Sequence, residues 1–469
     1  MNRAHICRAF WTATWLLAAC APAPMRAVSS AVDPIRAAFV VLGVDGAPTA
    51  RVITESPGCP SLDADGTLRP MSVRAAPSTE RQRPTLNAPA LSKPSAFPVL
   101  VCELALPGAH RASVDGHPLP LPSAAPRRIV VIGDSGCRLQ AASGLNQACN
   151  DADAWPFAQV VAAAAAAHPD VVIHVGDYHY RETPCPAADS GCAGSPWGYG
   201  WDAWNADLFV PARALFEAAP WIVVRGNHES CDRAGQGWWR TLDPRPLVAR
   251  RDCNNPADDA IGDFSDPYAV PLGSDARWIV FDSSKVGVAP LSPGDAMYAT
   301  YGTQLRMAIE LASRSPVNFF LDHHPILGFA PNPTRTPTGL YPGNGSLQSV
   351  LLPIQGERLF PDSFQALVSG HVHLFEVVSY LTDQSTQLIS GNAGAWADVP
   401  LPHDLPRGAT PLPGAVIGSI VSTNQSGFTI IERDSEGGWR VEARDRHGRL
   451  FTTCTLRDRK TRCVPETLP

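Results

Sequence analysis

Charged residues are scarce in this sequence and make up 17% of its 469 residues, against about a quarter in typical globular chains. The formal net charge is −6, so the chain lacks the basic excess that nucleic-acid-binding domains usually carry. No Cys-x-x-Cys pair and no internal repeat occurs. These absences argue against a nucleic-acid-binding protein and against a zinc-finger protein.

Proline and glycine are plentiful by contrast, with 46 Pro and 37 Gly. They predict an ordered, loop-rich protein without many long helices. The length exceeds what a single hydrophobic core usually organises. We therefore expect a small N-terminal β domain over residues 33–125, a central α/β domain over 126–400 and a C-terminal β extension over 401–469 that packs on the central domain.

The first 19 residues have the pattern of a secretory signal peptide. Arg3 and Arg8 precede the apolar stretch AFWTATWLLAA, which is too short to span a bilayer as a mature helix. The segment ends in LAAC, which resembles a bacterial lipobox and predicts a lipid anchor at Cys20. The alternative is an ordinary signal peptide that happens to contain a cysteine. Both interpretations predict export to the periplasm or cell envelope.

The twelve cysteines become ten if Cys7 is removed with the signal peptide and Cys20 is lipidated. In an exported chain an even number predicts disulfide bonds, and free buried thiols are the alternative. Neighbours along the chain close short loops, although sequence alone leaves the connectivity open. The expected pairs are Cys59 with Cys102, Cys137 with Cys149, Cys185 with Cys192, Cys231 with Cys253, and Cys454 with Cys463.

Apolar runs between residues 128 and 395 each end in a polar cluster. These runs read RIVVIGDSG, VVIHVGDYHY, WIVVRGNHES, FFLDHHP, ALVSGHVH and LISGNAG. Helices are expected between some of them, within WPFAQVVAAAAAAH and TQLRMAIELASR. Alternating strands and helices predict an α/β layer structure.

Carboxylates, an amide, a phenol and imidazoles stand directly after these predicted strands. A single histidine at such a position is most often a hydrogen-bonded structural residue, but five loops of this kind predict a shared site. Two adjacent metal ions need about this inventory of oxygen and nitrogen ligands. The candidates are Asp134, Asp177, Tyr180, Asn227, His228, His323, His324, His371 and His373.

These motifs resemble those of the calcineurin-like metallophosphoesterases, because GDSG, GDYHY, GNHE, HHP and GHVH follow one another in that family's order. Most of the superfamily has a histidine where this chain has Gly136, and Tyr180 stands three residues after Asp177. Both departures are similar to the purple acid phosphatase branch. The resemblance implies a four-layer α/β/β/α sandwich, and therefore an α/β fold, with a small N-terminal β domain.

The resemblance also implies two metal ions. Fe(III) is expected as metal one, held by Asp134, Asp177, Tyr180 and His373, because aspartate and tyrosinate favour a hard trivalent ion. A divalent Zn, Fe or Mn ion is expected as metal two, held by Asp177, Asn227, His323 and His371. His323 is preferred to His324 because the family ligand lies two residues before the proline. Tyr178, the rival of Tyr180, is expected to point to the other face of the strand.

An exported phosphatase follows from the resemblance, one that hydrolyses phosphomonoesters with metal-activated hydroxide. His228 is the first candidate for the general acid, followed by His324 and His179. The alternatives are a phosphodiesterase or nucleotidase that uses the same site, and a non-catalytic surface binding protein.

Two loops could border this site. One carries Trp197, Trp201 and Trp204, which could select a leaving group or only pack the loop. The other runs from Cys231 to Cys253, and its arginines could meet a substrate phosphate or remain solvated.

Overall fold

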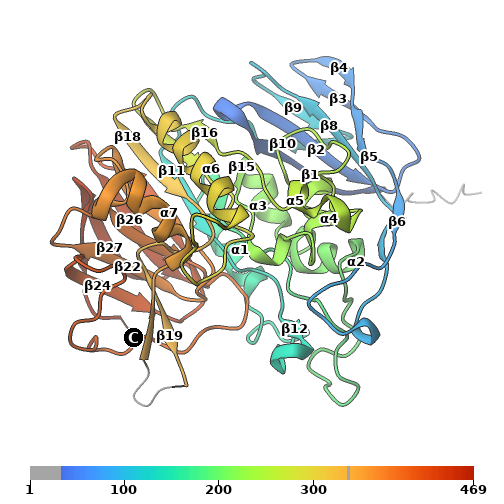
Figure 1. Cartoon of the computed structure of the whole chain (residues 1–469). Coiled ribbons are helices and arrows are strands. Elements are labelled where there is room, and N and C mark those ends of the chain that lie inside the picture. The colour runs from blue at the N-terminus through green and yellow to red at the C-terminus, as the bar shows by residue number, and fades with distance from the viewer. Residues whose placement is uncertain (1–32, 335–338, 469) are drawn as a thin grey trace, which may run out of the picture. The chain divides into compact units, whose positions relative to one another are not determined.

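The computed structural model describes residues 33–334 and 339–468 (Figure 1). The predicted signal peptide and Cys20 lie outside these ranges. Residues from Pro34 onward belong to one compact unit. The division of this unit into three domains stays a prediction.

The larger of the two main sheets has eleven strands and contains both ends of the described chain. Its centre is parallel, because β11 pairs with β14 and β14 with β15 in the same direction. In spatial order the strands are β28 (Lys460–Val464), β27 (Leu450–Arg457), β26 (Trp439–Asp445), β25 (Gly427–Arg433), β11 (Arg128–Ile132), β14 (Val171–His174), β15 (Trp221–Val223), β1 (Ile35–Leu42), β2 (Pro48–Thr54), β8 (Leu100–Ala105) and β5 (Ser72–Ala75). Figure 1 shows the blue N-terminal strands and the red C-terminal strands on opposite sides of the centre.

The second main sheet has seven strands, four of which run parallel. In spatial order they are β16 (Tyr268–Pro271), β17 (Ala276–Val280), β18 (Val317–Leu321), β21 (Phe364–Ser369), β23 (Thr386–Ser390), β22 (Phe375–Tyr380) and β24 (Ile417–Thr423). The parallel pairs are β17 with β18, β18 with β21, and β21 with β23. Both sheets therefore present the carboxyl ends of parallel strands.

Helices cover the outer face of each sheet. They are α1 (Phe157–Ala166), α2 (Trp201–Trp204), α3 (Arg213–Ala218), α4 (Gly235–Thr241), α5 (Asp259–Gly262), α6 (Ala296–Ala312) and α7 (Gly345–Gln355). The expected helices at 155–168 and 303–314 correspond to α1 and α6, and α6 begins earlier than the sequence pattern indicated.

Side chains that alternate along the strands build the layers. Val131 of β11 and Phe319 of β18 share one core between the sheets. Val130, the next residue of β11, instead packs with Val160 of α1 on the outer face, and Phe320 packs with helix α6. This arrangement confirms the α/β/β/α sandwich.

Smaller sheets and ribbons complete the described chain. Four short strands form a separate sheet in the order β10 (His117–Leu119), β9 (Ala112–Val114), β3 (Ser61–Ala64) and β4 (Thr67–Pro70). Three two-stranded ribbons pair β6 (Ser78–Glu80) with β7 (Ser95–Phe97), β12 (Leu139–Gln140) with β13 (Leu145–Asn146), and β19 (Phe329–Asn332) with β20 (Gly339–Pro342).

Five disulfide bonds join neighbouring cysteines along the chain, and their connectivity confirms every expected pair. Disulfides persist in oxidising compartments, so they favour an extracellular or periplasmic location. Within the described ranges, no helix has the length and apolarity that crossing a membrane requires.

Candidate metal centre

The first two predicted ligands leave the ends of β11 and β14 in an uncommon backbone conformation. Asp134 and Asp177 have φ angles of 56° and 58°, which lie in the left-handed region that few residues other than glycine adopt. The loops support each other, because the Asp134 amide donates to the Gly176 carbonyl at 3.0 Å and the Ser135 amide to the Asp177 carbonyl at 3.0 Å. Backbone strain of this kind is typical of functional sites.

Glycines in the motifs allow the loops to approach one another. A Cβ atom on Gly226 would overlap the Asp177 carboxylate, and one on Gly370 would lie 2.5 Å from Asp134 Oδ2. Gly136 stands where most members of the resembled superfamily have a histidine, and a Cβ atom there would lie 2.8 Å from both Asp207 Oδ2 and the Tyr180 amide. No larger side chain fits these places without displacing the loops.

The Tyr180 hydroxyl is the centre of one cluster of polar atoms. It lies 2.9 Å from Asp134 Oδ1, 2.8 Å from Asp177 Oδ2 and 2.8 Å from His373 Nε2. A hydroxyl has one proton and can donate it to only one of these atoms. The lone pairs of the other two acceptor atoms then face the lone pairs of the hydroxyl oxygen and repel them. A cation bound among these atoms would remove the repulsion.

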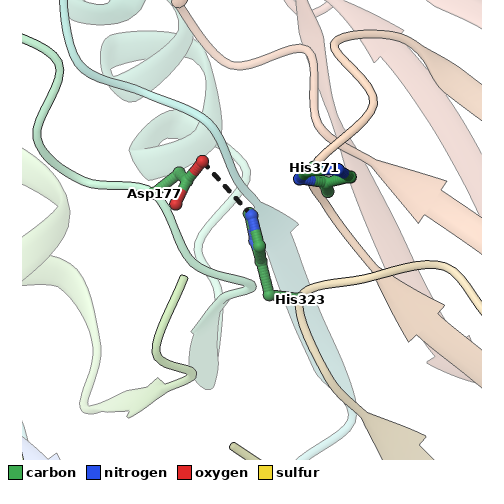
Figure 2. Close-up of side chains that lie close together, drawn as sticks. All are labelled: Asp177, His323 and His371. Atoms are coloured by element: carbon green, nitrogen blue, oxygen red, sulfur yellow. Dashed lines mark ion pairs between the residues drawn. The ribbon is translucent and has the colours of Figure 1, made fainter. Parts of the chain in front are cut away.

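A second cluster lies on the other side of Asp177. Asn227 Oδ1 is 3.0 Å from His323 Nε2 and 3.1 Å from His371 Nδ1, and Asp177 Oδ2 is 3.2 Å from His323 Nε2. Figure 2 shows Asp177 and His323 joined by this ion pair, with His371 facing them from a separate loop. Ligand atoms of Asp177, His323 and His371 all lie within 4.8 Å of one another, so these residues could hold a metal ion.

Hydrogen bonds behind the imidazoles fix which ring nitrogen faces the clusters. His323 Nδ1 lies 2.8 Å from the Val175 carbonyl, and His373 Nδ1 lies 2.6 Å from the Trp396 carbonyl. A carbonyl only accepts, so Nδ1 carries the proton in both rings. The Nε2 lone pairs therefore point into the clusters, which is the arrangement of metal-bound histidines.

The two clusters hold two carboxylates that are balanced by histidines alone among the described residues. Asp134 and Asp177 are buried, and within the described ranges their ion pairs involve histidines rather than lysine or arginine. Burial raises the pKa of Asp134. Burial opposes protonation of His323 as well, but Asp177 raises the pKa of that ring to about 10. The carboxylates thus draw positive charge to the clusters, and this set of oxygen and nitrogen donors fits bound cations in place of the protons.

Comparison with known proteins identifies the family. The family model of the calcineurin-like phosphoesterases matches residues 127–375. The chain belongs to this family. It is therefore a phosphoric ester hydrolase, and its family uses a dinuclear metal centre.

Two solved structures show the same fold at low sequence identity. A purple acid phosphatase, PPD1 from yellow lupin (Lupinus luteus) seeds, has a TM-score of 0.56 and 14% identity, over 90% of this chain and 75% of that one. PhoD has a TM-score of 0.50 and 11% identity, over 92% of each chain. No curated protein matches the chain.

Two carboxylates hold the loops of this phosphoesterase and were not among the predicted site residues. Glu229 accepts from the Asp177 and Gly226 amides at 3.0 Å and from the Tyr178 amide at 2.9 Å. Asp207 accepts from the Cys137 amide at 3.0 Å and the Tyr180 amide at 2.8 Å. Glu229 is the last residue of the GNHE motif, so the motif itself could have indicated it. Nothing in the sequence around Asp207 indicated its contacts.

Of the three acid candidates, His228 and His324 lie beside the clusters. The His228 ring packs against the Tyr180 ring, tilted by 43° with 3.9 Å between centroids, and its Nδ1 lies 2.9 Å from Glu182 Oε1. Burial, followed by the charge of Arg233, lowers the pKa of His228 to about 4. The ring of His324 lies 4.2 Å from that of His371.

His179 turns away from the clusters. It packs at 5.6 Å from both the Tyr199 and Trp204 rings, and neither of its ring nitrogens has a hydrogen-bond partner among the described residues.

Tyr178 and Tyr180 point in different directions. The Tyr178 hydroxyl lies 3.1 Å from the His174 carbonyl and 3.0 Å from the Val224 carbonyl, which are its hydrogen-bond acceptors. Tyr178 packs in the outer core with Trp201 and Trp204. These two tryptophans therefore pack the loop rather than line the site.

Most arginines of the 231–253 loop already pair with carboxylates. The ion pairs are Arg233 with Glu182, Arg240 with Glu80, Arg245 with Asp243 and Arg250 with Asp258. Arg233 also lies 2.6 Å from the ring nitrogens of His228. This loop therefore supports the site through His228, and these paired arginines are not free to bind a phosphate.

Proposed function

We propose that the chain is an exported, purple-acid-phosphatase-like enzyme that hydrolyses phosphomonoesters with two metal ions. The observation that carries this proposal is the Tyr180 hydroxyl, which contacts Asp134, Asp177 and His373 at 2.8–2.9 Å. A phenol in this place distinguishes the purple acid phosphatase pattern from the histidine of most relatives.

The two clusters of polar atoms suggest the ligand sets. Metal one, proposed as Fe(III), would be held by Asp134, Asp177, Tyr180 and His373. Metal two, a divalent Zn, Fe or Mn ion, would be held by Asp177, Asn227, His323 and His371. Asp177 is common to both sets because Oδ2 lies 2.8 Å from the Tyr180 hydroxyl and 3.2 Å from His323 Nε2.

When bound, two cations supply electrophilic charge for a phosphate ester and make a water molecule more acidic. The chain's own residues would orient the substrate and handle the leaving group. His228 is the proposed donor to the leaving oxygen, a role for its protonated form, which the lowered pKa of about 4 confines to acidic conditions. Glu182 accepts from His228 Nδ1 and so holds the ring with Nε2 on the side of Asp177, at 3.8 Å from its Oδ2.

A substrate panel tests the proposed activity. Metal-loaded protein should hydrolyse phosphomonoesters faster than phosphodiesters, and His371→Ala should lose at least about 100-fold in kcat/KM with the fold intact by circular dichroism. Preference for diesters would favour the phosphodiesterase alternative. Near-normal turnover with full metal content in His371→Ala would overturn the assignment of that residue.

The role of His228 has its own test. His228→Ala should retain metal and lose about 100-fold in kcat for poor leaving groups, but less for good ones, which need less protonation. Equal losses across a series of leaving groups would contradict an acid role. The same series measured on His324→Ala identifies the donor if His228 is not the residue.

We also propose a lipid anchor at Cys20, because LAAC ends the apolar segment of the predicted signal peptide. Cys20→Ser should abolish lipid labelling and release the protein from the membrane fraction. Unchanged membrane retention would indicate a different anchor.

A further inference from the structure

Arg138 lies beside the first cluster without an acidic partner. Its guanidinium carbon is 5.0 Å from the centroid of the Tyr180 ring. Its side chain is half-buried, and in the described ranges none of its guanidinium nitrogens forms a hydrogen bond or an ion pair; Nε is buried and unpartnered. A buried arginine nitrogen with no acceptor is costly, so this side chain is suited to an anionic ligand.

Neighbouring arginines differ from Arg138 in this respect. Arg181 pairs with Asp207 at 2.6 Å, and Arg233 pairs with Glu182. Their charges are already used inside the protein. The free charge next to the candidate metal centre therefore belongs to Arg138.

The backbone that carries Arg138 is held in place on several sides. Its amide donates to Gln147 Oε1 at 3.0 Å, and its carbonyl accepts from the Gln147 amide at 2.7 Å. The preceding residue is tied by the Cys137–Cys149 disulfide, and the Leu139 amide donates to the Tyr180 carbonyl at 3.0 Å. This support keeps the guanidinium at the Tyr180 ring without occupying its donors.

Electrostatics agree with a position close to both Tyr180 and His373. Burial, followed by Asp134 and Asp177, raises the pKa of Tyr180, and Arg138 opposes that rise. The charge of Arg138 also opposes the rise in the pKa of His373. Its positive charge therefore acts on the first cluster, at the residues Tyr180 and His373.

We propose that Arg138 binds a non-bridging phosphoryl oxygen of the substrate and selects phosphomonoester dianions over phosphodiester monoanions. This inference rests on the proposed function. Above the second phosphate pKa of about 6, a monoester carries one more negative charge than a diester. A guanidinium donates to phosphate oxygens, and a monoester offers three non-bridging oxygens where a diester offers two.

The test compares two substrates with the same leaving group, 4-nitrophenyl phosphate and bis(4-nitrophenyl) phosphate, above pH 7. Arg138→Met keeps an unbranched side chain at this position and removes the charge. The kcat/KM for the monoester should fall about 10–100-fold, the usual loss for a hydrogen bond to a charged group. The diester value should change much less, and Arg138→Lys should recover part of the loss. Arg127→Ala, an exposed arginine at the opposite end of β11, is the matched control and should leave both values unchanged.

Equal losses on both substrates would show that Arg138 does not select between them and would overturn the proposal. If wild-type protein hydrolyses neither substrate, calorimetry tests Arg138 instead. It measures the binding of inorganic phosphate to the metal-loaded protein. Weaker phosphate binding by Arg138→Met with full metal content then supports the arginine, while the absence of turnover counts against the proposed function. Unchanged phosphate binding would contradict the role of Arg138.

Discussion

At the scale of single residues, the side chain of Tyr180 decides what kind of phosphoesterase site this is. The sequence has two tyrosines, Tyr178 and Tyr180, on either side of His179. The resemblance selected Tyr180 by its spacing from Asp177, and strand alternation past Asp177 was the argument against Tyr178. The side chains do diverge, but Asp177 has a φ of 58° and the strand β14 ends at His174. A turn, rather than the pleat of a strand, separates them.

Tyr180→Phe should remove a violet charge-transfer band from iron-loaded protein and weaken iron retention, because a phenol gives up its proton to a trivalent ion. Tyr178→Phe should keep the band and cost about 1 kcal/mol of unfolding free energy, since it loses a buried hydrogen bond. Visible spectra and denaturant unfolding measure both. A band that vanishes only in Tyr178→Phe would show that the wrong tyrosine was assigned.

Glu376 on β22 is a buried acid outside the site, and burial raises its pKa to about 8. Its folded pKa lies above the ordinary value, so its contribution to stability is present at low pH and is lost as the pH rises through about 8. Glu376→Gln should therefore gain on the order of 1–3 kcal/mol relative to wild type between pH 5 and pH 9. Thermal unfolding across this range measures the difference, and parallel pH profiles would contradict the shifted pKa.

At the scale of elements, the strand ends could be predicted and the contacts between their loops could not. Each motif begins directly after an apolar strand, so the sequence indicates which edge of each sheet carries polar residues. Asp207 is 27 residues from Tyr180 and 70 from Cys137, whose amides it accepts. Contacts at such separations depend on how a long loop folds back, and no local pattern encodes that path.

Gly226 tests how tightly these loops pack. Gly226→Ala should displace the Asp177 carboxylate and reduce both metal affinity and kcat/KM by about 100-fold or more, since small misplacements of reacting groups are expensive. Gly58→Ala is the matched control, because a Cβ there has nothing within 4 Å and its backbone is not left-handed. Metal titration and kinetics measure both variants. Equal metal affinity and equal kcat/KM in the two variants would show that the loops can move apart to admit the added methyl group.

At the scale of the whole molecule, the layers and the disulfides follow from sequence while the strand order does not. Alternating runs predicted an α/β layer structure, the family resemblance implied the sandwich, and neighbouring cysteines were the expected partners in all five bonds. The pairing of β1 with β15 joins Val41 to Trp221. Such distant pairing depends on which edge each segment reaches in the folded chain, so the sequence pattern did not indicate it.

Thiol titration of unfolded, unreduced protein should find none of the ten bonded cysteines free. Reduction should then lower the unfolding midpoint, because the Cys59–Cys102 bond alone closes a loop of 43 residues and contributes about 2–4 kcal/mol. Several titratable thiols among the ten would contradict the bonded state of the chain.

The metal content of purified protein tests the central claim most directly, namely that strand ends of both sheets form one centre of two metal ions that share Asp177. Elemental analysis should find two metal ions per chain in wild-type protein and fewer in Asp177→Ala, which removes a ligand from both sets. Asp63→Ala, on the separate sheet at β3, should retain both ions. Wild-type protein that binds no metal, or Asp177→Ala protein that still binds two ions, would contradict this account.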